Sequence, residues 1–189
     1  THPSMCIPEM MRILMDDYNY SWEKAWEITI KVFAYTNHTI MAEALEKWSV
    51  DLFAPILPRI YTIIREINNR FCQYCNEIGA ASDLESMSII HNNMIRMANL
   101  CIVGSYNVNG VSGLHTDILK ADTFEAFNRI YPGKFNNVTN GIAHRRWLGQ
   151  ANPELTNYLN GLLGGDFIKD LSNIEELLKY ADDKTVLAD

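Results

Sequence analysis

Two short stretches concentrate side chains that form hydrogen bonds without carrying charge. One is KFNNVTNGIAHRRWL, from Lys134 to Leu148, in which asparagines and a threonine precede Trp147. The other is YTNHT at residues 35–39, which contains His38. Sugar hydroxyls donate and accept hydrogen bonds, so neutral amides and imidazoles match them, and an aromatic ring covers the apolar face of the sugar. The two stretches therefore predict a carbohydrate ligand.

The same residues also allow a purely structural interpretation. Asparagine and threonine often cap helices and tighten turns, because their side chains bond to nearby backbone groups. Asn37, Thr139 and Asn140 would then shape the backbone and contact no ligand. Residue type alone leaves both interpretations open.

Other kinds of active site lack their usual patterns. His38, His115 and several aspartates would suit a Ser/His/Asp hydrolase, but the chain has no G-x-S-x-G motif. The five histidines are scattered without a metal-binding spacing such as H-E-x-x-H. The glycines at 104, 110 and 113 do not form G-x-G-x-x-G. We therefore expect no metal site and no nucleotide-binding loop.

The four cysteines predict a reducing compartment and a cytoplasmic location. Cys72 and Cys75 form a single C-x-x-C, which would suit half of a zinc site or a redox pair. Packing on a helix is favoured instead, because no second pair follows and no strand precedes them. Cys6 and Cys101 lie in apolar surroundings, so both are expected to be buried thiols.

Length and composition predict one globular domain, because 189 residues with 48% hydrophobic side chains can bury a core. Sixteen basic and 23 acidic residues give a net charge of −7, and no stripe of lysine and arginine is present. These features argue against a nucleic-acid partner. The apolar runs are too short to span a bilayer, and the first residues lack the features of a signal peptide, so no membrane partner is expected.

Apolar periodicity predicts mainly helices. Pro8 suits the first turn of a helix, and Ser21 is placed to cap a second one. A long amphipathic helix follows Pro58 and ends at Gly79, and Ser82 with Glu85 resembles the capping box of another. Pro153 begins a further helix, and ELLKYADD at residues 176–183 suggests one more.

Two segments predict strands of a parallel sheet. One is residues 31–36, where the chain passes from the second helix into AYTNHT, and the other is the apolar run 97–103, followed by a helix-like stretch at 108–120. Ligands lie beyond the carboxyl ends of such strands, which would place His38 and Tyr106 at ligand level. No linker divides the chain, so residues 1–189 are expected to form one unit. The fold class is α/β, predominantly helical, with few short strands.

Five segments together resemble the glycogen, starch and maltodextrin phosphorylase family, in its order and at its spacings. They are THPSMCIPEMMRIL, AYTNHTIMAEALEKW, LPRIYTIIREIN, RMANLCIVGSYNVNGVSGLHTDILK and KFNNVTNGIAHRRWL. The resemblance covers essentially the whole chain. It implies a partial Rossmann-like lobe, namely the C-terminal part of the N-terminal lobe of a two-domain glycosyltransferase that is a homodimer. Such enzymes use pyridoxal 5′-phosphate and inorganic phosphate to release glucose-1-phosphate from an α-1,4-glucan.

The resemblance also implies roles for individual residues. The substrate side chains would be His38 and Asn140 at the 6-hydroxyl of the transferred glucosyl unit, Val111 beside the sugar, and Glu46 and His2 lining the adjacent channel. Trp147 would line the cofactor pocket. The family's cofactor-binding lysine and phosphate-binding residues belong to its C-terminal lobe, so this chain is expected to contain no catalytic residue and to be inactive alone.

Departures from the family pattern bear on fine specificity. Ala143 and His144 stand where the family usually has Thr-Pro, so the turn before Arg145 is expected to be looser. Tyr106 replaces a histidine or phenylalanine, and Ala42 replaces a proline. The alternative function is a non-catalytic helical interaction module. A downstream coding sequence resembling E-A-S-G-T-G-N-M-K-F, with its Schiff-base lysine, would exclude that alternative.

Overall fold

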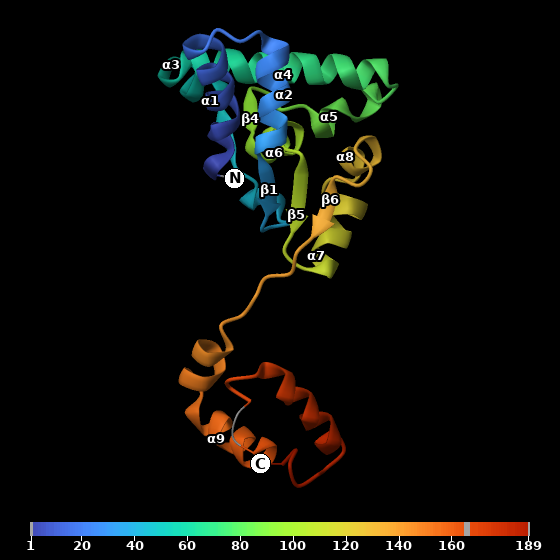
Figure 1. Cartoon of the computed structure of the whole chain (residues 1–189). Coiled ribbons are helices and arrows are strands. Elements are labelled where there is room, and N and C mark those ends of the chain that lie inside the picture. Colours follow the sequence, from blue (N-terminus) through green and yellow to red (C-terminus); the bar gives the residue numbers. More distant parts are fainter. Residues whose placement is uncertain (1, 165–166, 189) are drawn as a thin grey trace. The chain divides into compact units, whose positions relative to one another are not determined.

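The computed structural model describes residues 2–164 and 167–188, except for the side chain of His2 (Figure 1). The chain forms two compact units, Thr1–Thr139 and Asn140–Asp189, where the sequence predicts one. Residues 138–143, at the junction, belong to no helix or strand. The described residues are predominantly helical and contain two three-stranded sheets, so the predicted fold class is confirmed.

A parallel sheet forms the centre of the first unit. Its strands are β1 (Ala34–Asn37), β5 (Asn107–Gly110) and β6 (Phe135–Asn137), in the order β1-β5-β6 (Figure 1). Both strand pairs are parallel. Helix α7 (Gly113–Ile118) packs against β5 and β6 and lies between them in the chain, as parallel neighbours require.

The predicted strand at 97–103 is wrong. These residues form helix α6 (Met97–Gly104), which is buried along its whole length and packs against β1. A continuous apolar run suits a buried strand and a buried helix equally, so periodicity could not separate them. The strand comes later, as β5, and the helix predicted at 108–120 begins only at Gly113, continuing past α7 as a π-helical segment, Leu119–Thr123.

The placement of Tyr106 at ligand level is also wrong. Tyr106 precedes β5, and its backbone N–H donates to the carbonyl of Phe33, just before β1, at 2.9 Å. It therefore lies at the amino end of the sheet, opposite the edge where ligands bind. The error follows directly from placing the strand at 97–103.

The predicted helices of the first unit are largely confirmed. Helix α1 (Cys6–Arg12) continues as a π-helical segment, Ile13–Asp17, and α2 (Trp22–Val32) is capped by Ser21, whose hydroxyl accepts from the Lys24 N–H at 3.3 Å. Helix α4 (Pro58–Glu77) is the long amphipathic helix. Its buried face, which contacts the core, consists of Ile60, Ile63, Ile64, Ile67, Phe71 and Cys75. Gly79 follows with φ +76°, which glycine adopts without strain.

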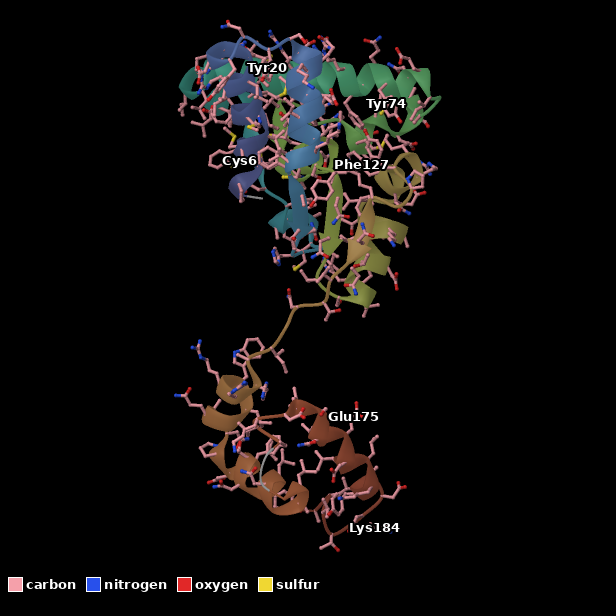
Figure 2. The ribbon with its side chains drawn as sticks, viewed as in Figure 1. Cys6, Tyr20, Tyr74, Phe127, Glu175 and Lys184 are labelled. Atoms are coloured by element: carbon pink, nitrogen blue, oxygen red, sulfur yellow. The ribbon has the colours of Figure 1, made fainter. Side chains whose placement is uncertain are left out.

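Aromatic stacking joins α4 to α8 (Glu125–Ile130). The rings of Phe71 and Phe127 stack at 5.8 Å between centroids, and Phe127 is labelled in Figure 2. A buried aromatic pair stabilises the core through the apolar area that it removes from water and through the favourable arrangement of the two rings. Cys75 is fully buried beside this contact surface, and burial raises the pKa of its thiol to about 11. The helix-packing interpretation of the C-x-x-C therefore holds for Cys75.

Two smaller predictions fail. Ser82 lies within a 3-10 turn, Ala81–Asp83, and α5 (Leu84–Met87) begins after Asp83 without a side-chain cap. The capping box is therefore not formed. Cys6 is exposed, whereas Cys101 is buried as expected. At Cys6 the neighbouring apolar residue Ile7 takes the buried position instead.

The second sheet is antiparallel, with the order β2-β4-β3. Its strands are β2 (Lys47–Ser49), β3 (Ile90–His91) and β4 (Met94–Arg96). Asn92 and Asn93 join β3 to β4 with φ of 47° and 59°, as a two-residue hairpin with both central residues left-handed requires. The remaining elements of the first unit are 3-10 turns His2–Met5 and Ala42–Ala44, and helix α3 (Val50–Ile56).

Within the described residues of the second unit, 140–164 and 167–188, there are three helical segments. They are a π-helical segment, Arg145–Gln150, helix α9 (Pro153–Leu163) and a 3-10 segment, Leu171–Tyr180. The helices predicted at Pro153 and near ELLKYADD are thus present, and the Asn152 side chain caps the first. Among the helices of residues 2–164 and 167–188, none is long and apolar enough to cross a membrane.

Candidate functional site

The three parallel strands end at the same level. Asn37, Gly110 and Asn137 are register partners at the carboxyl ends of β1, β5 and β6. The next residue after each strand is His38, Val111 and Val138, respectively. Neighbouring strands lie about 4.8 Å apart, so the backbones of these three residues come together at the edge where parallel sheets bind ligands. His38 is exposed and Val111 half-buried.

A buried hydrogen-bond network fixes the backbone beneath His38. The Asn37 side chain is 1% exposed, and its Oδ1 accepts from the His115 ring Nε2 at 3.0 Å and from the Thr39 N–H at 3.1 Å. Its Nδ2 donates to the Tyr35 hydroxyl at 3.0 Å. Burial raises the pKa of Tyr35 to about 12, so this phenol stays neutral. Asn37 therefore ties the end of β1 to helix α7.

The network settles one of the two interpretations of the asparagines. Asn37 holds a turn around His38, because its side chain bonds to the N–H two residues later. It is a structural residue, while His38, the next residue in the chain, is exposed. Asn37 and His115 are 78 positions apart in the sequence, so no local pattern links either of them to the position of His38. The position of Asn37 near the end of a predicted strand could have suggested a role at this edge. Nothing in the sequence around His115 indicated that it would bond to Asn37.

Close packing beneath Val111 also positions this edge. A Cβ added at Gly110 would meet Oγ1 and the backbone Cα of Thr116 on α7. Only a residue without a side chain lets the helix approach the strand this closely. Ser112 then caps α7 by accepting from the His115 N–H at 3.1 Å. The short loop that carries Val111 is therefore held at both ends.

Replacing Gly110 by alanine should destabilise the first unit by about 2 kcal/mol, because the new methyl group overpacks against backbone that cannot rotate away. Urea unfolding monitored by circular dichroism measures the change. Gly113→Ala is the matched control, because nothing lies within 4 Å of its Cβ position and alanine favours a helix. Equal stability of the two variants would contradict the close-packing argument.

Glu46 lies beside a separate hollow. Its carboxylate accepts from the Trp48 indole N–H at 2.7 Å, and it lines a hollow of about 320 Å³. His38 lines another, of about 270 Å³, which runs along β1. Ser4, from the turn that also contains His2, lines both hollows. The side chain of His2 lies outside the described part of the structure.

The remaining predicted site residues belong to the second unit. Asn140 is exposed, and Trp147 is 65% exposed on the π-helical segment. His144 precedes that segment with φ −57°, close to the angle that proline imposes, and its Nε2 bonds to the Ile168 carbonyl at 2.9 Å. His144 thus ties the turn before Arg145 to Ile168.

Comparison with known proteins identifies the family. A sequence model of the family described as carbohydrate phosphorylase matches residues 1–189. The chain belongs to this family. It is 49% identical to a glycogen phosphorylase of Bacillus subtilis (strain 168) over 185 residues, which are 97% of the chain. It is 46% identical over 197 residues to the muscle form of glycogen phosphorylase from Ovis aries, and that match covers 100% of the chain.

A plant relative has the same degree of similarity. The chain is 47% identical over 191 residues to the cytosolic alpha-glucan phosphorylase 2 of Arabidopsis thaliana, which covers 97% of the chain. In each of these three comparisons the chain spans 23% of the relative's length. The family is thus shown over the whole of this chain, and the chain corresponds to roughly a quarter of these relatives.

The geometry groups some members of the predicted site. His38 and Val111 meet at the carboxyl edge of the parallel sheet, and Glu46 lies at the neighbouring hollow. Among the described residues, no cluster of three histidine, cysteine or acidic side chains could hold a metal ion. The edge instead offers an exposed imidazole and an apolar side chain over a buried amide network, which suits a neutral, hydroxyl-bearing ligand.

Proposed function

We propose that this chain is the substrate-side part of an enzyme that cleaves α-1,4-glucans by phosphorolysis to release glucose-1-phosphate. The observation that carries the proposal is the family match over all 189 residues, together with relatives named as glycogen and alpha-glucan phosphorylases. The helical interaction module has no comparable support. We place the enzyme in the cytoplasm as a homodimer, in keeping with free cysteines and a relative named as cytosolic.

The proposed roles follow the chemistry of each side chain. His38 and Asn140 hydrogen-bond the 6-hydroxyl of the terminal glucosyl unit, and Val111 contacts its apolar face. His2 and Glu46 line the channel beside it. Neutral groups suit this task, because they match hydroxyls without the cost of burying charge. The Asn37–His115 network supports the role of His38 by keeping the turn that carries it in one conformation.

Pyridoxal 5′-phosphate is the proposed cofactor of the whole enzyme. Trp147 suits a flat ring, because its indole is large and 65% exposed. When bound, the cofactor supplies a phosphate group that takes part in proton transfer with the inorganic phosphate. The attachment lysine is expected outside these 189 residues, so the chain itself contributes packing and substrate hydrogen bonds.

The proposed function is tested directly on the full-length protein. Maltooligosaccharide and inorganic phosphate should yield glucose-1-phosphate, and omission of phosphate should abolish the product. A full-length protein that is loaded with pyridoxal phosphate and still yields no glucose-1-phosphate would contradict the proposal. Hydrolysis to free glucose without phosphate incorporation would assign a different reaction to the same fold.

Trp147→Ala in the full-length protein should release pyridoxal phosphate at least about tenfold faster, because the indole would no longer cover the bound cofactor ring, a contact worth more than about 1 kcal/mol. Cofactor absorbance after dialysis and glucan binding are measured on one preparation. Tyr18→Ala is the control, since Tyr18 is another largely exposed aromatic residue and has no proposed role in the site. Full cofactor retention combined with lost glucan binding would assign Trp147 to the glucan instead.

A further inference from the structure

A large hollow of the first unit lies at the amino end of the parallel sheet. It measures about 820 Å³ and is formed by α2, α4 and the two loops that precede β5 and β6. Cavities of roughly 300–1,000 Å³ are typical of small-molecule sites. Tyr106, which lies at the amino end of the sheet, lines this cavity. The cavity is therefore at the opposite end of the sheet from His38. We refer to it as the amino-end cavity; His38, Val111 and Glu46 do not line it.

Six aromatic rings line the amino-end cavity. They come from both helices and both loops, and are Trp22, Trp26, Phe71, Tyr74, Tyr106 and Tyr131. Tyr74, labelled on α4 in Figure 2, stacks on Tyr131 with centroids 6.2 Å apart and planes 6° from parallel. Flat, rigid faces of this kind bind a planar apolar body without losing much conformational entropy.

Three basic side chains line the same cavity, and two of them are neutralised. Lys31 pairs with Glu27 at 2.8 Å. Arg70 pairs with Glu66 at 2.7 Å and also lies over the Trp22 ring. These charges are already matched, so they add little attraction for an anion.

Lys134 is different from the other two. Its ammonium lies over the Tyr131 ring, 4.3 Å from the centroid, and within residues 2–164 and 167–188 no carboxylate pairs with it. Its position is fixed, because its N–H donates to the Tyr131 carbonyl and its own carbonyl accepts from Val108 on β5. Gly133, at φ +84°, makes the tight turn between them. A half-buried cation held this way has one unit of positive charge available to a ligand.

We propose that the amino-end cavity binds a small aromatic monocarboxylate, with its ring system against the aromatic lining and its carboxylate paired with the ammonium of Lys134. A single available cation matches a single negative charge, whereas a dianionic phosphate would leave one charge uncompensated in an apolar site. The aromatic faces select a planar body over a flexible aliphatic one. This inference is independent of the sugar site and of the reaction.

Binding should depend on pH through Lys134. Burial lowers the pKa of its ammonium to about 8, so the free protein carries this charge below that pH and loses it above. Affinity for a carboxylate should therefore be constant below pH 8 and fall about tenfold per pH unit above it. The other charged or titratable side chains lining the cavity are Lys31, Arg70, Tyr74, Tyr106 and Tyr131.

The test uses the full-length protein with 2-naphthoate as the probe. Binding is measured by calorimetry and by the change in fluorescence of Trp22 and Trp26. Lys134→Met keeps the aliphatic stem and removes the charge, so it should lower the affinity for 2-naphthoate at least about tenfold. The affinity of the same variant for the neutral analogue 2-naphthamide should fall less than about threefold, since the amide makes no ion pair with Lys134. Lys31→Met is the matched control and should bind 2-naphthoate nearly as well as the unmodified protein.

Several results would overturn the proposal. One is the absence of 2-naphthoate binding at millimolar concentration, which includes the case in which another segment of the protein fills the cavity. Another is an equal loss for the acid and the amide in Lys134→Met. If that variant does not fold, Lys134→Arg, which keeps the charge, and the pH titration of the unmodified protein decide. Affinity unchanged between pH 7 and pH 10 would then reject Lys134 as the anion partner.

Discussion

The 189-residue chain, expressed alone and mixed with phosphate, maltooligosaccharide and pyridoxal phosphate, is expected to release no glucose-1-phosphate. Its proposed site residues bind and orient the sugar, and none of them moves a proton at the reacting atoms. The cofactor's phosphate, which takes part in the acid and base chemistry, would have no attachment lysine. Loss of this machinery should remove essentially all of the rate enhancement, which amounts to at least about 10⁶-fold in enzymes.

The assay needs a folded chain and an active reference. Circular dichroism should show the predominantly helical content of the structure, and the full-length protein measured in parallel should be active. Turnover by the isolated chain at about 1 per second or more, a typical enzymatic rate, would contradict the assignment of all catalytic groups to the rest of the protein. It would require a catalytic residue among the side chains described above.

The parts of the fold that the sequence predicted correctly are those with a clear period or cap. Helix α4 shows an uninterrupted apolar stripe after Pro58, and its boundaries follow from Pro58 and Gly79. Helix α6 has no such stripe, because all of its faces are buried, and it was therefore predicted as a strand. A helix that is apolar all round gives no periodic signal, so only tertiary structure identifies it.

The prediction of a strand where α6 lies explains why Tyr106 was placed at the wrong end of the sheet, although His38 was placed at the correct end. His38 follows a strand that the sequence placed correctly, so its position at the carboxyl edge was predictable. Tyr106 follows α6 and precedes β5, so the misplaced strand moved it to the wrong end of the sheet. The bond between Asn37 and His115 joins residues 78 positions apart, and no local pattern could indicate it. The division at Asn140 was missed because residues 138–143 lack a linker-like composition.

In the full-length protein, Asn140→Ala should lower kcat/KM for glucosyl transfer by roughly 10- to 100-fold, as expected for about 1–3 kcal/mol when a buried hydrogen bond loses one partner. The effect should appear in kcat/KM because the amide contacts the glucosyl unit that moves in the transition state. Initial rates of glucose-1-phosphate release at limiting maltooligosaccharide measure it. Asn136→Ala is the control, since Asn136 lies in the same stretch but on strand β6.

A substrate that lacks the 6-hydroxyl separates sugar recognition from a structural role. A maltooligosaccharide whose terminal unit is xylose removes the hydroxyl that Asn140 is proposed to bind, so the loss caused by Asn140→Ala should shrink markedly with this substrate. The two changes delete the same interaction, and their free energies should therefore be strongly non-additive in a double-mutant cycle. Asn140 is followed by Gly141, and an amide that merely shaped this turn would affect both substrates alike. Strict additivity would thus leave Asn140 as a turn residue, and the recognition of the 6-hydroxyl would rest on His38 alone.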